Sequence, residues 1–298
     1  MTSALIGESQ ASSRGEILPL RILVAHPYIT PEIFSFSEKH PQEVSILIDS
    51  GAYTYHQKHQ RFGVEQYIDF IKGLPVKPWG YFQLDVIGNP EETRKNLYKM
   101  LKAGLEPIPI YTRGHEPEEI EELYKVSDVI ALGGISGVQG GSHIATYIKN
   151  LQPYIAGRKY HCLGLGDARR ITNLKPYSTD CTNHLTARKF GRVHLYMGRG
   201  EFVAIDRDTF KKKPPQKILK RIRQLGFDPY HFAKLEAWKG TKLKPRLILS
   251  LYSQWLYQED MRKHVGVNMF FAEDSANILP DYDILHGLIH GKHINEYI

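Results

Sequence analysis

Short apolar segments recur along the chain at intervals of about 20 to 35 residues, and stretches with the apolar spacing of a helix separate them. These segments predict strands at 21–25, 46–49, 80–85, 107–111, 128–132, 159–163 and 177–181, with an eighth at 193–196 or 202–205. Neighbouring parallel strands need a long connection, and the intervening helices supply it. The alternation therefore predicts an α/β fold with parallel strands.

Acidic residues or glycine turns follow several of the predicted strands. They are Asp49, Asp85, Gly133-Gly134, Gly164-Leu-Gly166 and Asp180. A (β/α)8 barrel brings the C-terminal ends of all its strands to one rim, whereas an open doubly wound sheet has its site at one switch point with a glycine-rich phosphate loop. Because these residues follow many strands, we predict a (β/α)8 TIM barrel and keep the open sheet as the alternative.

The composition changes after the last predicted strand. A run that begins at Lys211 is dense in positive charge, and the segments up to about residue 263 have helical spacing. The candidate nucleic-acid-binding residues of this run are Lys211, Lys212, Lys213, Lys217, Lys220, Arg221 and Arg223. We therefore divide the chain into a flexible tail at 1–16, a catalytic barrel at 17–208, and a basic, mainly helical C-terminal region at 209–298 that packs on the barrel.

The charge balance favours a polyanionic partner. The 298 residues include 39 lysines and arginines against 32 aspartates and glutamates, which gives a formal net charge of +7. Lysine and arginine neutralise phosphates and release counterions, so a concentrated basic run suits a nucleic acid; a solvated basic face is the alternative. The sequence contains no apolar run of the roughly 18 residues that span a bilayer and no secretory signal at its start, so we expect a cytoplasmic protein without a membrane partner.

The cysteines and histidines argue against a metal site. Cys162 and Cys181 are too few for a thiolate zinc site or a disulfide framework. His286 and His290 have the spacing of one helix face, but the glycines beside them weaken such a helix. We therefore expect no metal and no cofactor, and assign no role to the C-terminal histidines.

In a barrel, three carboxylates would meet at the rim: Asp49, Asp85 and Asp180. Like charges held close raise one another's pKa, so one carboxyl can donate a proton while another stays ionised as a nucleophile. Such a set suits cleavage at an anomeric carbon with retention of configuration. Taken singly, each aspartate is equally explained as a helix cap or turn residue.

Five strings of this sequence resemble, in the same order, motifs of the tRNA-guanine transglycosylases. They are Asp49-Ser-Gly-Ala-Tyr53, Asp85, Leu132-Gly-Gly-Ile-Ser136, Leu163-Gly-Leu-Gly166 and Ser178-Thr-Asp-Cys181. The resemblance covers roughly residues 20–200. It implies that Asp180 is the nucleophile that attacks C1′ of a guanosine, and that Asp49 is the general acid/base.

The resemblance also implies a set of substrate-binding residues. Asp85 would read the edge of the base, and Tyr53 would stack on its ring. The pocket lining would include Ser50, Gly133, Gly134, Leu163 and Gly164, and Arg113 would stand where the family has a glutamine.

Several departures separate the chain from the tRNA enzymes. Those enzymes carry a cysteine-rich zinc subdomain after the nucleophile, and nothing after Cys181 supplies its thiolates. The chain is more similar to the zinc-free DNA 7-deazaguanine transglycosylases (DpdA type) of phages and bacteria, which exchange guanine in DNA for a 7-deazapurine such as preQ0. The sequence thus predicts a glycosyltransferase that acts on DNA in the cytoplasm, the host's if a phage encodes it.

Other functions stay open. The polymer substrate is tRNA in one alternative, and in another the protein is a barrel glycoside or nucleoside hydrolase in which water replaces the incoming base. A non-catalytic nucleic-acid-binding barrel is the third. His184, four residues after Asp180, is either a structural histidine or a phosphate contact.

Overall fold

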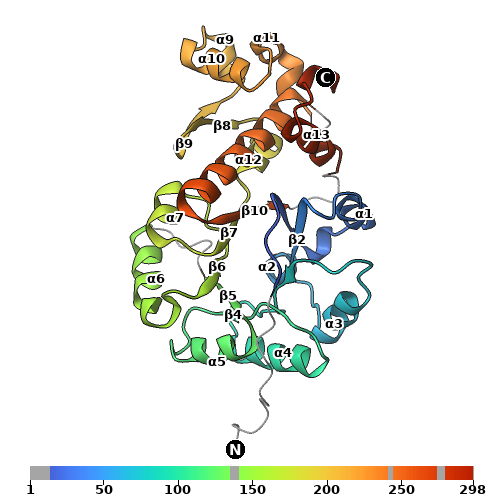
Figure 1. Cartoon of the computed structure of the whole chain (residues 1–298), viewed down its shortest axis with the longest axis vertical. Coiled ribbons are helices and arrows are strands. Elements are labelled where there is room, and N and C mark those ends of the chain that lie inside the picture. Colours follow the sequence, from blue (N-terminus) through green and yellow to red (C-terminus); the bar gives the residue numbers. More distant parts are fainter. Residues whose placement is uncertain (1–13, 135–140, 241–243, 274–278, 298) are drawn as a thin grey trace, which may run out of the picture. The chain divides into compact units, whose positions relative to one another are not determined.

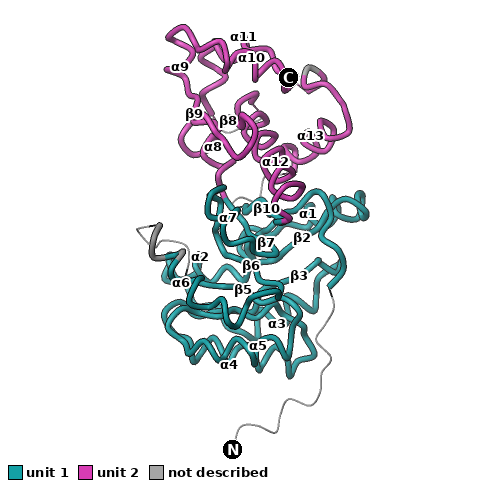
Figure 2. Tube along the Cα trace, turned by 60° about the vertical axis from the view of Figure 1, so that its left-hand side comes forward, with its two compact units in different colours: residues 1–181, 267–274 teal, residues 182–266, 275–298 magenta. Residues whose placement is uncertain are grey.

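The structure, a computed structural model, describes residues 14–134, 141–240, 244–273 and 279–297. The chain forms two compact units, the first made of residues 1–181 and 267–274 and the second of residues 182–266 and 275–298 (Figure 2).

The first unit is built on an eight-stranded sheet with the strand order β3-β2-β1-β10-β7-β6-β5-β4, and its strand ladders are parallel. The strands are β1 (Leu20–Ala25), β2 (Val44–Asp49), β3 (Gly80–Tyr81), β4 (Ile110–Tyr111), β5 (Val129–Leu132), β6 (Lys159–Cys162), β7 (Ser178–Cys181) and β10 (Asn268–Glu273). The prediction of a parallel α/β fold is confirmed.

Helices alternate with these strands, and the longer ones lie outside the curled sheet (Figure 1). They are η1 (His26–Tyr28), α1 (Pro31–Lys39), α2 (Ala52–Gln57), α3 (Val64–Lys72), α4 (Pro90–Lys102), α5 (Glu119–Val126), α6 (Gly141–Ile155) and α7 (Ala168–Leu174). At the start of α4, Asn89 Oδ1 accepts a hydrogen bond from the Glu92 amide at 3.1 Å, and Pro90 fills the first turn. The sequence predicted this cap because proline and acidic residues suit a helix N-terminus.

Buried apolar side chains pack together on the inner side of the curled sheet. The buried members of this cluster are Ile17, Leu23, Leu47, Phe82, Ile108, Ile110, Val129, Ala131, Phe270 and Ala272. The ring of Phe82 lies 5.1 Å from that of His161 on β6, although β3 and β6 are far apart in the strand order. Phe82 also forms a parallel bridge with Ile108, so the segments that continue β3 and precede β4 are paired.

Arg14 and Gly15 make contacts with the sheet, although the sequence predicted a flexible tail up to residue 16. Arg14 Nη1 donates to Ser127 Oγ at 2.8 Å and to Asp128 Oδ1 at 3.0 Å. The indole N–H of Trp79 donates to the carbonyl of Gly15 at 2.9 Å. Arg14 and Gly15, which we expected within a flexible tail, are therefore held at the N-terminal ends of the strands, while residues 1–13 lie outside the described residues.

The predicted position of the eighth strand is wrong. The eighth strand is β10, which pairs with β1 on one side and β7 on the other. The two segments that we expected to supply it, β8 (Val193–Gly198) and β9 (Glu201–Ile205), form a separate antiparallel hairpin. The turn between them has positive φ at Arg199 and Gly200, and strands joined by so short a turn pair only antiparallel.

The second unit therefore interrupts the first between β7 and β10. Its helices are η2 (Asn183–Leu185), α8 (Thr186–Phe190), α9 (Arg207–Lys211), α10 (Gln216–Gln224), α11 (Pro229–Ala233), η3 (Leu235–Trp238), α12 (Pro245–Val265), α13 (Leu279–Ile289) and η4 (Ile294–Glu296). Its own core includes the buried side chains of Leu195, Ile222, Phe232 and Ile248. The division between the units falls after Cys181 rather than at residue 208.

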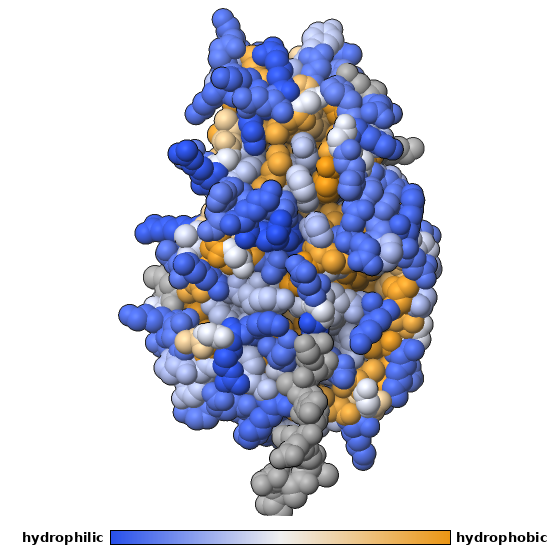
Figure 3. Space-filling view, in the orientation of Figure 1, coloured by the Kyte–Doolittle hydropathy of each residue, from blue (hydrophilic) through white to orange (hydrophobic). Residues whose placement is uncertain are grey.

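Hydrophilic residues predominate on the face of the molecule drawn in Figure 3. Among the described residues, no helix has both the length and the apolar composition to cross a bilayer.

Candidate active site

The turn after β2 fixes the carboxyl group of Asp49. Asp49 is the last residue of β2, and its Oδ1 accepts a hydrogen bond from the Gly51 amide at 2.5 Å. Gly51 has φ of 78°, and a Cβ at this position would lie 2.4 Å from Cδ of Pro27. Only glycine accommodates both the left-handed backbone and the contact, so the sequence Asp-Ser-Gly sets the turn.

We expect Gly51→Ala to lower the free energy of unfolding by more than the roughly 1 to 2 kcal/mol that left-handed backbone costs an alanine, because the added methyl also meets Pro27. The matched control is Gly88→Ala, since Gly88 has φ of 74° and no heavy atom lies within 4 Å of the place that an added methyl would take. Urea unfolding of both variants measures the difference. Equal losses in the two variants would show that the contact with Pro27 is not limiting.

Ser50 connects the first two predicted carboxylates. Its hydroxyl donates to Asp85 Oδ1 at 3.2 Å and accepts from the Ala52 amide at 3.3 Å. Ser50 is buried. Asp85 lies four residues beyond the end of β3 rather than on that strand as predicted. The strand ends early because the Ile110 amide donates to the side chain of Gln83, at 3.0 Å, rather than to a backbone carbonyl that would continue the ladder.

The protein surroundings raise the pKa of both carboxyls. Burial and the nearby charge of Asp85 raise the pKa of Asp49 from 3.8 to about 7, against the opposing hydrogen bond from Gly51; Asp180 raises it further. Burial raises the pKa of Asp85, and the hydrogen bond from Ser50 opposes that rise. Asp85 and Asp180 therefore both act on Asp49, which is able to exchange a proton near neutral pH.

Asp180 is held by two donors. It lies on β7 with 8% of its surface exposed. Its Oδ1 accepts from the Gly164 amide at 2.8 Å and contacts His161 Nε2 at 3.1 Å. On the other side of the ring, His161 Nδ1 lies 2.9 Å from Ser178 Oγ. These contacts fix the position of Oδ1.

The sequence patterns did not identify His161 as a site residue. They indicated a strand at 159–163 but gave this histidine no role. His161 pairs with Ser178 in the register of β6 and β7, and side chains of parallel neighbours at paired positions lie on the same face. Because side chains alternate along a strand, Ser178 and Asp180 lie on that same face of β7. Once the β6–β7 register is known, this shared face identifies His161 as a neighbour of Asp180.

His26 at the end of β1 was also missed. Its Nδ1 lies 2.7 Å from the hydroxyl of Tyr55 on α2, and its ring stacks on Phe62 at 4.5 Å. Burial lowers the pKa of His26, which favours the neutral ring. Ala25 pairs with Asp49 in the β1–β2 register, so the next residue, His26, lies close to the acid/base candidate. Its contact with Tyr55 therefore holds α2 beside Asp49.

The glycine turn after β5 lies against Arg113. The Gly133 amide donates to the Tyr111 carbonyl at 2.9 Å, and Gly134 has φ of 72°. A Cβ on Gly134 would lie 2.9 Å from Cβ of Arg113, whose guanidinium lies over the ring of Tyr147 at 5.6 Å. The rest of this motif, residues 135–140, lies outside the described residues.

Two other predicted pocket residues differ in exposure. Leu163, next to Gly164, packs against the inward apolar cluster. Tyr53 on α2 is 66% exposed, so its ring is accessible to a ligand.

The predicted cationic residues of the second unit fall into two groups. Arg221 and Lys211 have intramolecular partners: Arg221 Nε donates to the Tyr196 carbonyl at 2.7 Å, and Lys211 pairs with Asp208 at 3.0 Å. The other group, which is exposed to solvent, comprises Lys212, Lys213, Lys217, Lys220 and Arg223. On α10, Ile218 and Ile222 are buried, so the lysines of that helix lie on its solvent side.

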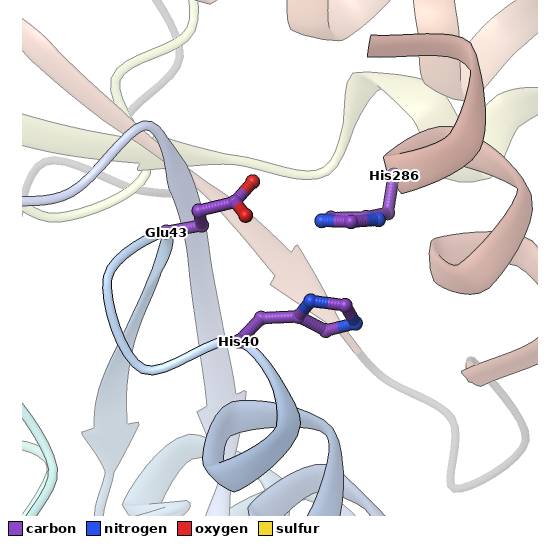
Figure 4. Close-up of side chains that lie close together, drawn as sticks. All are labelled: His40, Glu43 and His286. Atoms are coloured by element: carbon purple, nitrogen blue, oxygen red, sulfur yellow. The ribbon is translucent and has the colours of Figure 1, made fainter. Parts of the chain in front are cut away.

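The histidines that the sequence analysis left without a role lie in the second unit. His184 in η2 is buried, and its carbonyl accepts from Ser250 Oγ at 3.0 Å. His286 lies on α13 and His290 directly follows that helix; their rings lie 4.4 Å apart. Figure 4 labels His286, which belongs to the second unit. It also labels His40 and Glu43 of the first unit, which lie in the turn between α1 and β2. The expectation that the chain uses no metal stays a prediction.

Comparison of the chain with protein-family models gives no match, and comparison with curated proteins gives none either. The resemblance to the transglycosylases therefore stays a prediction, and the geometry of the site is the basis for a functional proposal.

Proposed function

We propose that the protein is a base-exchange transglycosylase that replaces guanine in DNA with a 7-deazaguanine base, such as preQ0, through a covalent aspartyl-glycosyl intermediate. One observation carries the proposal. A carboxylate held by two donors, Asp180, acts electrostatically on a second carboxyl, Asp49, whose pKa is about 7. Retaining transfer at an anomeric carbon requires this pair of roles, a nucleophile and a proton carrier.

The strand arrangement supports a (β/α)8 barrel as the scaffold of this chemistry. Eight parallel strands alternate with helices, and the bridge from Phe82 to Ile108 pairs the segments beside the two edge strands. Barrel enzymes have their active sites at the C-terminal ends of the strands, and Asp49 and Asp180 lie at or near the ends of β2 and β7.

In the first step, an oxygen of Asp180 attacks C1′ of the target nucleotide. The new C–O bond forms while the bond from C1′ to the guanine nitrogen breaks, and the electron pair of that bond goes to the departing base. Asp49, protonated before the step, gives its proton to the base, which leaves as neutral guanine. Asp49 is then the carboxylate.

In the second step, the incoming base takes the place of guanine. Its ring nitrogen attacks C1′, the bond from C1′ to Asp180 breaks, and the electron pair returns to the carboxylate. The proton on that nitrogen passes to Asp49, which restores both residues to their starting states. Two inversions at C1′ give net retention.

The base pocket is proposed to recognise guanine and its deaza analogues through Asp85. A carboxylate accepts hydrogen bonds from an exocyclic amine and a ring N–H, and Ser50 holds Asp85 for this purpose. Gly133, Gly134 and Gly164 have no side chains to obstruct a flat ring, and the exposed ring of Tyr53 is available to stack on the base.

DNA is the proposed polymer, and tRNA is the alternative. A base inside a duplex is out of reach of a recessed carboxylate, so the target nucleotide has to leave the stack. The exposed lysines of α10 and the run before it suit contacts to phosphates, and such a substrate implies action in the cytoplasm.

Base incorporation tests the proposed function directly. The protein is incubated with labelled guanine or preQ0 and with either duplex DNA or tRNA. Label in DNA supports the proposal, and label in tRNA alone would move the substrate to tRNA. Release of guanine without incorporation would identify a hydrolase. Binding without release, incorporation or adduct would identify a non-catalytic binding protein.

We expect Lys217→Ala combined with Lys220→Ala to weaken DNA binding and to reduce the slope of log affinity against log salt by about 2, because each lysine that no longer neutralises a phosphate lowers the slope by close to one. Fluorescence anisotropy at several salt concentrations measures the slope. Lys39→Ala combined with Lys72→Ala removes the same charge from exposed positions of the first unit. If the two double variants change the slope equally, α10 is not the surface that binds DNA.

A further inference from the structure

The two oxygens of Asp180 differ in their surroundings. Oδ1 contacts both the Gly164 amide and His161 Nε2, at 2.8 Å and 3.1 Å. Among the described residues, no hydrogen bond to Oδ2 is present. An oxygen that already accepts two hydrogen bonds is the weaker nucleophile, so the geometry distinguishes a held oxygen from an attacking one.

The contact with Asp180 distinguishes the two neutral tautomers of His161, and Ser178 completes the favoured one. A neutral imidazole has one N–H and one acceptor nitrogen. With the proton on Nε2, the ring donates to Asp180, and Nδ1 accepts from the Ser178 hydroxyl at 2.9 Å. With the proton on Nδ1, the lone pair of Nε2 would face the carboxylate at 3.1 Å, which is repulsive.

The ring of His161 is also fixed in place. None of its surface is exposed, and the rings of Phe82 and Phe270 lie 5.1 Å and 6.2 Å from it. A buried histidine between a hydroxyl and a carboxylate loses little further freedom when the carboxylate reacts. The imidazole therefore restricts the rotation of the Asp180 carboxyl without contacting the substrate itself.

We propose that His161, oriented by Ser178, is the positioning residue of the nucleophile: it holds Oδ1 of Asp180 so that Oδ2 attacks C1′. This inference rests on the proposed function, because it assigns the attacking atom of the transfer step.

The charges around Asp180 explain why a donor is needed there. Asp180 interacts with Asp49 on β2 and with the thiol of Cys162 on β6. Burial raises the pKa of Cys162, so the thiol stays neutral. The neighbouring residue on β10, Phe270, is apolar. The donors on Oδ1 therefore offset part of the repulsion between the carboxyls of Asp180 and Asp49.

The first experiment does not depend on catalysis. Nitrogen-15 NMR of the histidine-labelled full chain reports which ring nitrogen carries a proton. We expect a proton on Nε2 of His161, and we expect its resonance to move in Asp180→Ala. A ring protonated on Nδ1 alone, or an Nε2–H signal unchanged in Asp180→Ala, would overturn the holding role.

The second experiment measures single-turnover formation of the covalent adduct. We expect His161→Leu to slow adduct formation about 100-fold with DNA affinity unchanged, because misplacing a reacting group by about 1 Å has this effect. His161→Gln keeps an N–H near the position of Nε2, so it should recover at least about tenfold of the loss. A structural role alone would leave both variants equally slow or unfolded, which thermal unfolding detects.

The two experiments separate the two proposals. If the wild-type protein forms no adduct with DNA or tRNA, the proposed function fails, and the assignment of Oδ2 as the attacking atom fails with it. The NMR experiment then still decides whether His161 holds Asp180. If the wild-type protein forms the adduct and His161→Leu forms it equally fast, the proposed function stands and the positioning role is refuted.

Discussion

Asp180→Ala is expected to abolish the covalent adduct between the protein and DNA, with a loss of at least about 10⁴-fold in transfer, because the nucleophile itself is removed. DNA affinity should change little, since Asp180 is recessed and carries no positive charge. Denaturing electrophoresis with labelled DNA detects the adduct, and peptide mapping locates the modified residue.

Asp180→Asn sharpens this test. The amide oxygen of asparagine still accepts hydrogen bonds from Gly164 and His161, so the local structure is kept while the carboxylate is removed. Asp128→Asn is the matched control, because Asp128 is a carboxylate of the same unit that pairs with Arg14 and Lys159 away from the site. An adduct that persists in Asp180→Asn, or one that maps to Asp49, would assign the nucleophile elsewhere.

Local sequence patterns were sufficient to predict most of the sheet. The apolar run before Asp49 forms β2 as expected, and the Ser-Gly turn that follows it leads into α2. Such signals act over a few residues, so they are visible in the sequence alone. The same kind of signal overestimated the fourth predicted strand, which is reduced to Ile110–Tyr111, because Pro107 and Pro109 have no N–H for a ladder.

Long-range pairing was beyond the sequence patterns. One partner of β7 is β10, which follows residues 182–266 of the second unit, whereas β8 and β9 are nearer in the chain but pair with each other. Nothing local in the segment Asn268–Glu273 indicates which strand it joins, because register and partner depend on the complete sheet. The same limit hid His161, whose contact with Asp180 depends on the β6–β7 register.

Asp49→Asn is expected to make the stability of the first unit less dependent on pH. The pKa of Asp49 is raised to about 7 in the folded protein from 3.8, so the folded state binds this proton more tightly than the unfolded state does. Stability from this group is complete below about pH 4 and is lost as the pH rises through about 7. The difference in pKa corresponds to an upper limit on the order of 4 kcal/mol.

Asparagine keeps the acceptor for the Gly51 amide but has no proton to lose, so the two proteins should unfold alike at pH 4 and diverge by pH 8, where the variant is the more stable. Urea unfolding at several pH values measures the divergence. Asp206→Asn is a control with no trend in this range: a hydrogen bond from the Thr209 amide holds the pKa of Asp206 below its usual value, so the stability from this group changes only below about pH 4. A constant difference between wild type and Asp49→Asn from pH 4 to 8 would show that Asp49 is ionised throughout. In that case it could not supply the proton that the departing base requires, and the acid role would have to pass to Asp85, whose pKa burial also raises.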